Sequence, residues 1–310
     1  MISRLEQLCE AAGRLGPKRV AVAAAANDLV LKSIQETEEM GFVQPLLVGR
    51  AEEIRSVSSE IGYRISEDRI VPTETKDEAA PTAVRLVRSG KADILMKGYL
   101  HTDTLLRAVL DKEAGLRTDR LLSHVFLMQV PTYHKLLAVT DAAINIAPDL
   151  LQKAAIVQNA IDLMRRLGVE RPKVAVLSSV ETINPRIPST IDAACLHKMA
   201  ERGQIVGGMV DGPFAFDNAI SRQAALEKGI DSPVSGDADI LLAPDLDAGN
   251  ILSKNLEYLA AAQMAGIVLG SAVPIVLTSR SDPPRARIYS LALAVILSHN
   301  AGEIMPGDTP

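Results

Sequence analysis

Short apolar runs without polar alternation are the feature that most constrains how this chain folds. Runs of four to six apolar residues are typical of parallel strands that are buried on both faces. Between them lie amphipathic stretches such as 150–166, where Leu150, Ala154, Val157 and Ile161 recur at helical steps and predict one buried stripe. This alternation predicts an α/β fold of mostly parallel sheet. The predicted strands are 19–24, 44–49, 94–97, 136–139, 173–177, 205–210, 240–243 and 274–278, and the predicted helices include 28–40, 79–89, 149–167, 191–202 and 252–265.

Composition favours an aliphatic core and excludes several classes of protein. The 310 residues are 47% hydrophobic but only 3% aromatic, so Ala, Val, Leu and Ile must fill the core. The net charge of −5 provides no basic field for nucleic acid or an anionic membrane. Cys9 and Cys195 are too few for a disulfide framework or a four-ligand zinc site and indicate reduced cytosolic thiols. The uncharged stretch 258–279 is broken by Gly and Pro, so we expect a soluble, cytoplasmic protein.

Fingerprints of the common nucleotide-binding and hydrolase folds do not occur in the sequence. The segment after the first predicted strand reads AVAAAAND, with no G-x-G-x-x-G, and neither a P-loop nor a G-x-S-x-G elbow is found. The five histidines show no metal-ligand spacing, so we expect no dedicated metal site.

Polar, often glycine-bearing segments follow several of the predicted strands. In open α/β sheets ligands bind at these strand ends, where helix N-termini present free N–H groups to anions. Any one such segment is better explained as a βα turn, but six of them in one chain favour an anion site at this edge. Asn145 and Asn250 lie in two of them, near predicted helix starts. The segments are 96–98, 140–148, 178–179, 211–213, 244–250 and 278–282.

Four basic side chains are candidates for binding an anion at these strand ends. Arg280 follows a strand and Ser279, and its planar guanidinium matches phosphate in a bidentate way; the alternative is a surface arginine paired with Asp282. Arg117 and Arg120 form a second basic cluster that either clamps an anion or covers a helix end. Lys97 either binds phosphate or is a solvated strand end.

Seven segments of the chain together resemble one enzyme family. They occur in this chain in the same order as in the phosphate acyltransferases, and they resemble the butyryl branch of that family more than the acetyl branch. They cover nearly the whole chain. The segments are MKG at 96–98, GLRTD and LSHVFLM within 115–128, TDAAINIAPD at 140–149, PKVAVLSS at 172–179, VDGPFAFDNAIS at 210–221, GDADILLAPDLDAGN at 236–250 and PIVLTSR at 274–280.

The resemblance implies reversible transfer of a short-chain acyl group, butyryl or similar, between CoA and inorganic phosphate. Acyl-CoA and phosphate are then substrates, and no cofactor or metal is expected. The implied architecture is that of isocitrate and isopropylmalate dehydrogenases, with two α/β domains and a cleft between them. We expect the first domain to comprise 1–131 and 282–310 and the second 132–281. A homodimer or higher homo-oligomer is also implied.

The resemblance also assigns roles to individual residues. Ser279 corresponds to the family serine at the CoA thiol, and Arg280 to the arginine at phosphate or acyl phosphate. Arg117 corresponds best to a further phosphate-binding arginine. The acetyl branch has an aspartate, proposed as a base, where this chain has Ala286, so Asp282 becomes the candidate base. The alternative is that Asp282 caps the turn before the following prolines.

The mechanism predicted from these roles is direct transfer in a ternary complex, without an acyl-enzyme. Lys97, Arg117 and the helix starts near Asn145 and Asn250 are then expected to bind the anionic substrates. Two alternatives stay open. A metal- and NAD-dependent decarboxylating dehydrogenase of the same fold would use the numerous aspartates as metal ligands. A non-catalytic protein that binds CoA or acyl phosphate is favoured only by Ala286.

Overall fold

The computed structural model describes residues 1–279 and 282–299, which form two compact units. The middle unit comprises Met1–Leu5 and Leu121–Met264. The terminal unit comprises Glu6–Arg120 and the described residues from Ala265 onward. The domain boundaries expected at 131/132 and 281/282 stay a prediction, because compactness of the folded chain does not test which segments fold on their own.

The terminal unit contains a mostly parallel sheet in the order β3-β2-β1-β4-β11-β10. All neighbouring pairs are parallel except β10 and β11, which form an antiparallel hairpin. Strands β1, β2 and β4 are apolar at most positions, as expected of strands covered on both faces. The strands are β1 (Lys18–Ala23), β2 (Val43–Gly49), β3 (Ile70–Pro72), β4 (Ile94–Lys97), β10 (Gln263–Leu269) and β11 (Ile275–Val276).

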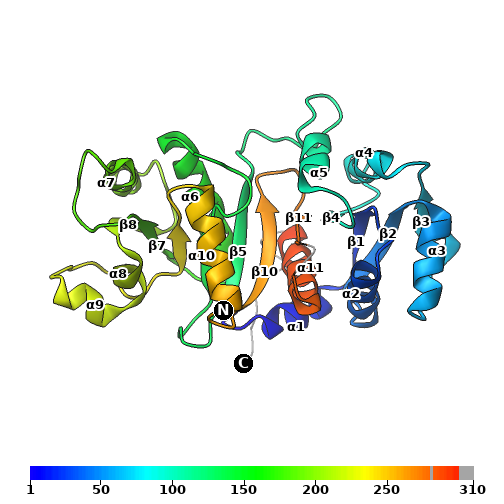
Figure 1. Cartoon of the computed structure of the whole chain (residues 1–310), viewed down its shortest axis with the longest axis horizontal. Coiled ribbons are helices and arrows are strands. Elements are labelled where there is room, and N and C mark those ends of the chain that lie inside the picture. Colours follow the sequence, from blue (N-terminus) through cyan, green and yellow to red (C-terminus); the bar gives the residue numbers. More distant parts are fainter. Residues whose placement is uncertain (280–281, 300–310) are drawn as a thin grey trace. The chain divides into compact units, whose positions relative to one another are not determined.

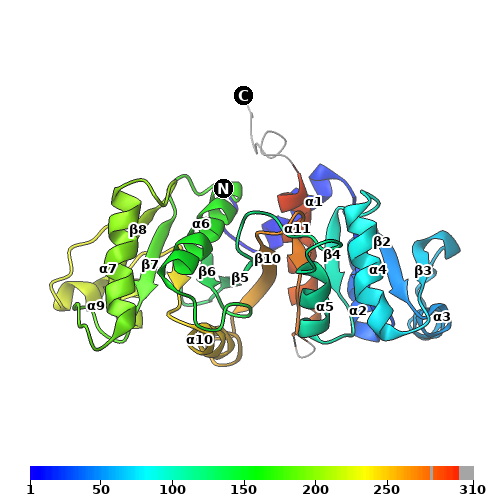
Figure 2. The same ribbon diagram turned by 90° about the horizontal axis from the view of Figure 1, so that it is seen from above.

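Helices cover both faces of this sheet, with α1, α2 and α11 packed together in one group and α4 and α5 in another (Figures 1 and 2). Helix α11 is buried on every side from Ala286 to Ile296, which is typical of a helix inside a core. Asn27 caps α2 as predicted, since its side chain accepts a hydrogen bond from Val30 N at 3.2 Å. The helices are α1 (Glu6–Leu15), α2 (Asp28–Glu39), α3 (Ala51–Glu60), η1 (Glu67–Arg69), α4 (Lys76–Arg88), α5 (Thr102–Val109) and α11 (Pro284–Ser298).

The middle unit has its own strands in the order β5-β6-β9-β7-β8, with β5 and β6 antiparallel and the rest parallel. Helix α6 begins at a capping box formed by Asp149 and Gln152 and ends before Gly168, whose φ of 93° terminates it as predicted. The strands are β5 (Ser123–Gln129), β6 (Leu137–Thr140), β7 (Lys173–Leu177), β8 (Met209–Phe214) and β9 (Ile240–Leu242). The helices are α6 (Leu150–Arg166), α7 (Pro188–Glu201), α8 (Phe216–Ile220), α9 (Arg222–Glu227) and α10 (Leu246–Tyr258).

The predicted α/β class with mostly parallel strands is confirmed, and two predicted elements are corrected. The strand predicted at 205–210 begins at Met209, because Gly207 has a φ of 82° and turns the chain before it. The helix predicted at 252–265 ends at Tyr258, because Ala261 adopts a φ of 52°, after which 263–269 is a strand.

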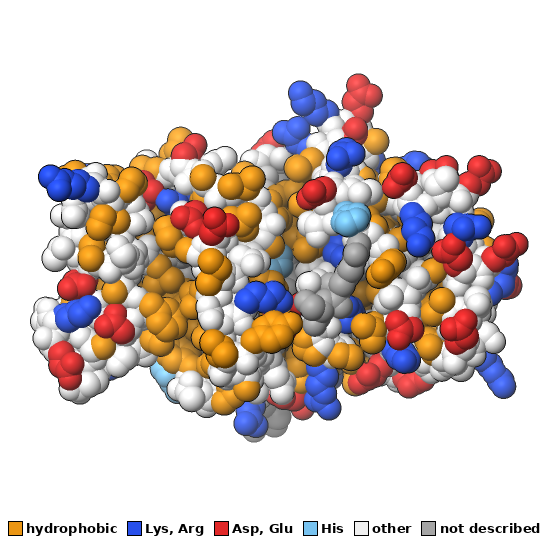
Figure 3. Space-filling model, in the orientation of Figure 1, with side chains coloured by type: hydrophobic (Ala, Val, Ile, Leu, Met, Phe, Trp, Pro, Cys, Tyr) orange, Lys and Arg blue, Asp and Glu red, His pale blue; other side chains and the backbone are white. Residues whose placement is uncertain are grey.

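The distribution of charged side chains on the surface agrees with the modest net charge of −5. On the face drawn in Figure 3, basic and acidic side chains are interspersed rather than gathered into one area of a single sign. Within the described residues, no helix is both long and apolar enough to cross a membrane.

Candidate functional site

The carboxyl ends of three neighbouring parallel strands lie side by side in the terminal unit. Strand β4 pairs with β1 through Ala23 opposite Lys97, and with β11 through Met96 opposite Val276. Each of the three strands is followed by a loop and then a helix, namely α2, α5 and α11. Ligands of open α/β sheets bind outside such strand ends, so this edge is the candidate site.

Lys97 is the last residue of β4 and is almost completely buried, with 4% of its surface exposed. Its Nζ lies 3.4 Å from the carbonyl oxygen of Leu100 and 3.5 Å from that of Gly98. A buried ammonium group is costly unless polar groups or an anion accompany it. The alternative of a solvated strand end therefore does not hold, whereas phosphate binding by Lys97 stays a prediction.

Gly98 allows the loop after β4 to lie directly against the loop after β1. The N–H groups of Gly98 and Tyr99 each donate at 2.8 Å, to the carbonyls of Ala23 and Ala24 respectively. A Cβ atom at position 98 would lie 2.3 Å from the Ala24 carbonyl oxygen, which is too close for any other residue. The strand ends are thus joined into one rigid edge.

Ser279 and Asp282 form a turn that links β11 to α11. The Ser279 N–H donates to Oδ2 of Asp282 at 2.7 Å, and the Asp282 N–H donates to the Ser279 carbonyl at 3.4 Å. Ser279 is exposed, whereas Asp282 is only 4% exposed. The turn-closing role that was the alternative for Asp282 is thus present in the structure, and its role as a base stays a prediction.

Arg280 lies outside the described residues, so its contact with phosphate stays a prediction. Ala286 is buried in the first turn of α11, and its N–H donates to the Pro283 carbonyl at 3.0 Å. The position of the expected aspartate in the acetyl branch therefore carries no group that transfers a proton.

Arg287 is the residue of this site that the sequence analysis missed. The residue is 3% exposed, and its guanidinium donates from Nη1 to the Asp282 carbonyl and from Nη2 to the Ser279 carbonyl, both at 3.0 Å. Burial lowers the pKa of the guanidinium, and the carboxylates of Asp282 and Asp28 oppose that shift. The signal in the sequence is an arginine followed by the apolar stretch IYSLALAVIL, in a helix that is otherwise core.

Arg117 lies elsewhere in the terminal unit. Its backbone forms an antiparallel bridge with Ser271, and Thr118 Oγ1 donates to the Gly270 carbonyl at 2.7 Å. Ser271 precedes β11 and Ser279 follows it, so Arg117 and Ser279 lie at opposite ends of that strand. Arg120 belongs to the same loop, with its N–H donating to Thr118 Oγ1 at 3.0 Å. The structure thus does not bring Arg117 to Ser279 within this unit.

In the middle unit, Asp141 organises the loop that follows β6. One carboxylate oxygen accepts hydrogen bonds from the N–H groups of Ala143 at 2.9 Å and Ile144 at 3.0 Å. The other accepts from His124 N at 3.1 Å and from Asn145 Nδ2 at 2.5 Å. Asp141 is 3% exposed, so it holds the loop from within. The signal for it is an aspartate that directly follows an apolar strand and precedes small residues.

Asn145 and Asn250 both contribute hydrogen bonds that hold the loop after β6 in place. The amide of Asn145 also donates to the Leu122 carbonyl at 2.9 Å, so both of its N–H groups are used within the protein. Asn250 Nδ2 donates to the Ala142 carbonyl at 3.1 Å. Gly249 lets α10 approach, since a Cβ there would lie 2.3 Å from the Asp141 carbonyl oxygen. In these positions the two asparagines stabilise the loop, and their contact with substrate stays a prediction.

The helix starts differ in how open they are to an anion. Asp149 caps α6, and Asp245 caps α10 by accepting from Ala248 N at 2.9 Å, so an anion at either start would meet a carboxylate. Helix α11 follows Pro283 and α5 follows His101, neither with a side-chain cap. At the edge that carries Lys97 and Ser279, α5 and α11 thus begin without a side-chain cap, whereas Asn27 caps α2. The starts of α3, α7 and α8 are uncapped as well, so the caps alone do not single out this edge.

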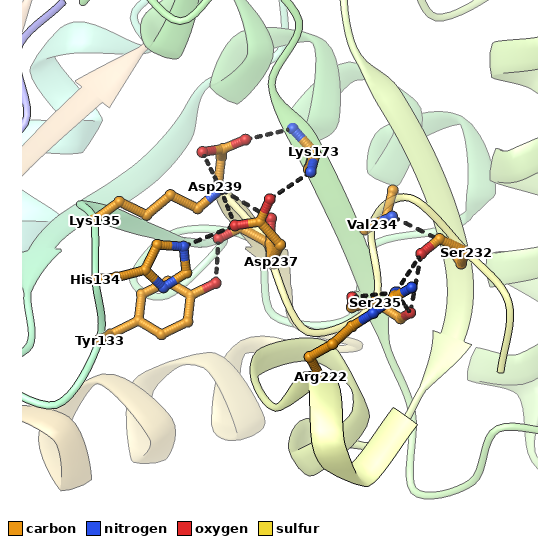
Figure 4. Close-up of polar contacts among 11 residues, drawn as sticks. Tyr133, His134, Lys135, Lys173, Arg222, Ser232, Val234, Ser235, Asp237 and Asp239 are labelled. Carbon is orange, nitrogen blue, oxygen red and sulfur yellow. Dashed lines mark hydrogen bonds and ion pairs between the residues drawn. The ribbon is translucent and has the colours of Figure 1, made fainter. Parts of the chain in front are cut away.

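The aspartates before β9 are engaged in an ion-pair network that is shown in Figure 4. Lys135 Nζ lies 2.9 Å from Asp237 and 2.8 Å from Asp239, and Lys173 and His134 also contact Asp237. Burial pushes the pKa of Asp237 upward, but hydrogen bonds from Lys173, Lys135 and His134 outweigh it and hold that pKa well below its usual range. This network lies at the amino ends of β7 and β9. Because ligands bind at the carboxyl ends of such strands, the network is interpreted as stabilising the sheet rather than as binding a ligand.

The environment of Cys9 makes it a poor nucleophile. Burial, together with the charges of Glu36 and Glu6, raises the pKa of the Cys9 thiol to about 11. The thiol is therefore protonated at neutral pH, whereas reactive cysteines have a lowered pKa.

Comparison with known proteins gives consistent matches over most of the chain. A family model described as "Phosphate acetyl/butaryl transferase" matches residues 69–295. A phosphate acetyltransferase of Rhizobium meliloti is 50% identical over 294 residues, which cover 95% of this chain and 93% of that protein. A phosphate butyryltransferase of Clostridium acetobutylicum is 44% identical over 283 residues, covering 91% and 94%. The crystal structure of a branched-chain phosphotransacylase from Enterococcus faecalis is similar with a TM-score of 0.81 and 33% identity, covering 91% of this chain and 99% of that one.

Proposed function

Because the chain belongs to the phosphate acetyl/butyryl transferase family, we propose that it transfers a short-chain acyl group reversibly between CoA and inorganic phosphate. The observation that carries this proposal is the family match over residues 69–295, together with relatives that share 44–50% identity across more than nine-tenths of the chain. The buried ammonium of Lys97 and the exposed Ser279, at one edge of the terminal unit's sheet, support this proposal as candidate groups for the anionic substrates.

The proposed reaction needs little covalent help from the protein. A phosphate oxygen attacks the thioester carbonyl carbon, and the tetrahedral intermediate collapses as the C–S bond breaks. The products are acyl phosphate and CoA thiolate, which takes up a proton. Because a free thiol has a pKa of about 8.5, the thiolate is an acceptable leaving group. The main requirement is to hold an anionic nucleophile beside an anionic thioester substrate.

The terminal unit offers groups for that requirement. The buried ammonium of Lys97 supplies positive potential at the strand ends. Arg280 is proposed to bind phosphate and the exposed Ser279 to donate its hydroxyl to the departing thiolate. Asp282 is retained as the candidate proton acceptor in the reverse direction, in competition with its turn-closing hydrogen bond.

Transfer is proposed to be direct, within a ternary complex. The raised pKa of the Cys9 thiol, about 11, argues against Cys9 as an acyl carrier. The test is isotope exchange between labelled CoA and butyryl-CoA in phosphate-free buffer. We expect no exchange, whereas exchange at a rate comparable with turnover would indicate an acyl-enzyme.

The acyl chain is proposed to be butyryl or a similar short or branched chain, with acetyl as the second candidate. Motifs of the butyryl branch and the similarity to a branched-chain phosphotransacylase support the first, and 50% identity to a phosphate acetyltransferase favours the second. Thiol release from acetyl-, propionyl-, butyryl- and isobutyryl-CoA, with and without phosphate, tests both. A higher kcat/KM for butyryl- or isobutyryl-CoA supports the first candidate, and a preference for acetyl-CoA overturns it. Release that ignores phosphate would contradict the function itself.

Further properties follow from the family and are proposals at the same level. They are an isocitrate/isopropylmalate dehydrogenase-like architecture, a cytoplasmic location and a homo-oligomeric state. Light scattering coupled to size-exclusion chromatography tests the last of these, and a monomer at micromolar concentration would contradict it.

A further inference from the structure

Arg287 occupies a position in α11 that is unfavourable for a cation. It lies in the first two turns of the helix, where the backbone dipole repels positive charge, and only 3% of it is exposed. Burial lowers the pKa of its guanidinium, with only the Asp282 and Asp28 carboxylates in opposition. A cation in such a place is costly to bury. Helix stability alone therefore does not account for this residue.

The contacts of Arg287 are directed at the backbone of the turn rather than at its own helix. Nη1 donates to the carbonyl of Asp282 and Nη2 to the carbonyl of Ser279, each at 3.0 Å. The Ser279 N–H is fixed in turn by Oδ2 of Asp282 at 2.7 Å. One planar fork thus holds the carbonyl groups of both residues at a set spacing, which is the geometry that a guanidinium provides and an ammonium does not.

We propose that Arg287 is a positioning residue for the acyl transfer proposed above, in that its guanidinium fixes the backbone of Ser279 and Asp282 and thereby the place at which the Ser279 hydroxyl meets the substrate. The inference rests on the proposed function for its catalytic consequence, whereas the fixing of the turn stands on the contacts of Arg287 alone. Arg287 itself remains buried and does not touch the substrate.

The test compares Arg287→Met and Arg287→Lys with the matched control Arg285→Met. Arg285 is an exposed arginine of the same first turns whose guanidinium lies 3.5 Å from the Tyr289 hydroxyl. Three quantities are measured: the melting temperature, kcat and KM for phosphate and for acyl-CoA, and hydrogen–deuterium exchange of the peptide 277–284. The exchange reports the turn directly and does not depend on the enzyme being active.

For Arg287→Met we expect faster exchange in this peptide and a kcat about 100-fold lower, as for a reacting group displaced by about 1 Å. The melting temperature is expected to fall as well, because two hydrogen bonds to a charged group are lost. Arg287→Lys keeps the positive charge but not the planar pair of donors. Its exchange rate and its kcat are therefore expected to lie between those of Arg287→Met and those of the wild type. Arg285→Met is expected to match the wild type in all three.

Wild-type exchange in a folded Arg287→Met protein would overturn the positioning role, whatever its activity. If Arg287→Met does not fold, Arg287→Lys decides: faster exchange supports the role, and wild-type exchange overturns it. If the wild type itself shows no phosphate-dependent thiol release, the proposed function fails, while the exchange still decides whether Arg287 fixes the turn.

Discussion

The turn after β11 depends on two buried charges that act on backbone atoms. The Asp282 carboxylate binds the Ser279 N–H, and Arg287 binds the carbonyl groups of both residues. Hydrogen bonds to charged groups contribute about 1.5–3 kcal/mol, more than neutral ones. The exposed Ser279 is therefore held by buried neighbours, which is how a reactive group is kept in place without a rigid side chain of its own.

Replacement of Arg280 by alanine tests the residue that is proposed to bind phosphate. Loss of a charged, bidentate contact is expected to raise KM for phosphate by roughly 10- to 150-fold, with a smaller change in KM for acyl-CoA. Steady-state kinetics with varied phosphate measures this, and circular dichroism checks the fold. Arg285→Met is the control. Unchanged phosphate kinetics in Arg280→Ala would remove Arg280 from the site.

At the level of single elements, the strand ends of the two units differ in chemistry. The carboxyl end of β4 in the terminal unit carries the buried Lys97, whereas the amino ends of β7 and β9 carry the paired charges of Asp237, Lys135 and Lys173. The ion-pair network therefore lies at strand ends where open α/β sheets do not bind ligands, whereas Lys97 lies at ends where they do.

The ion pairs at the amino ends of β7 and β9 predict how stability changes with acid. The pKa of Asp237 is lowered from 3.8 in the folded protein, so its contribution is complete at neutral pH and is lost as the pH falls below about 4. Asp237→Asn is expected to unfold at a lower urea concentration than the wild type at pH 7. This gap between the urea midpoints of the two proteins is expected to narrow below pH 4. Asp231→Asn, at an exposed carboxylate, is the control. A gap that stays constant with pH would contradict the assignment.

The elements also show what sequence patterns can predict. Buried parallel strands and their polar ends were predictable, because continuous apolar runs and the residues that follow them are local features; Lys97 and Ser279 were found in this way. The antiparallel strand β10 was not, because nothing local distinguishes an apolar strand from a helix end in QMAGIVL. Arg287 was missed because the sequence does not show that its long side chain reaches back to the carbonyl groups of Ser279 and Asp282.

At the scale of the whole molecule, sequence similarity covers both compact units. The family match runs from residue 69 to 295, so it includes parts of the terminal and the middle unit. The terminal unit provides the candidate anion site, and the middle unit provides a loop that is fixed by Asp141, Asn145 and Asn250. The proposed function is thus a property of the full chain and has to be measured on it.

The most direct measurement is the stoichiometry of products when the full-length protein is mixed with butyryl-CoA and inorganic phosphate. Free thiol is titrated, and acyl phosphate is trapped with hydroxylamine in the same sample. We expect one acyl phosphate for each thiol released, and no release when phosphate is omitted. Thiol release without acyl phosphate, or at the same rate without phosphate, would contradict the account.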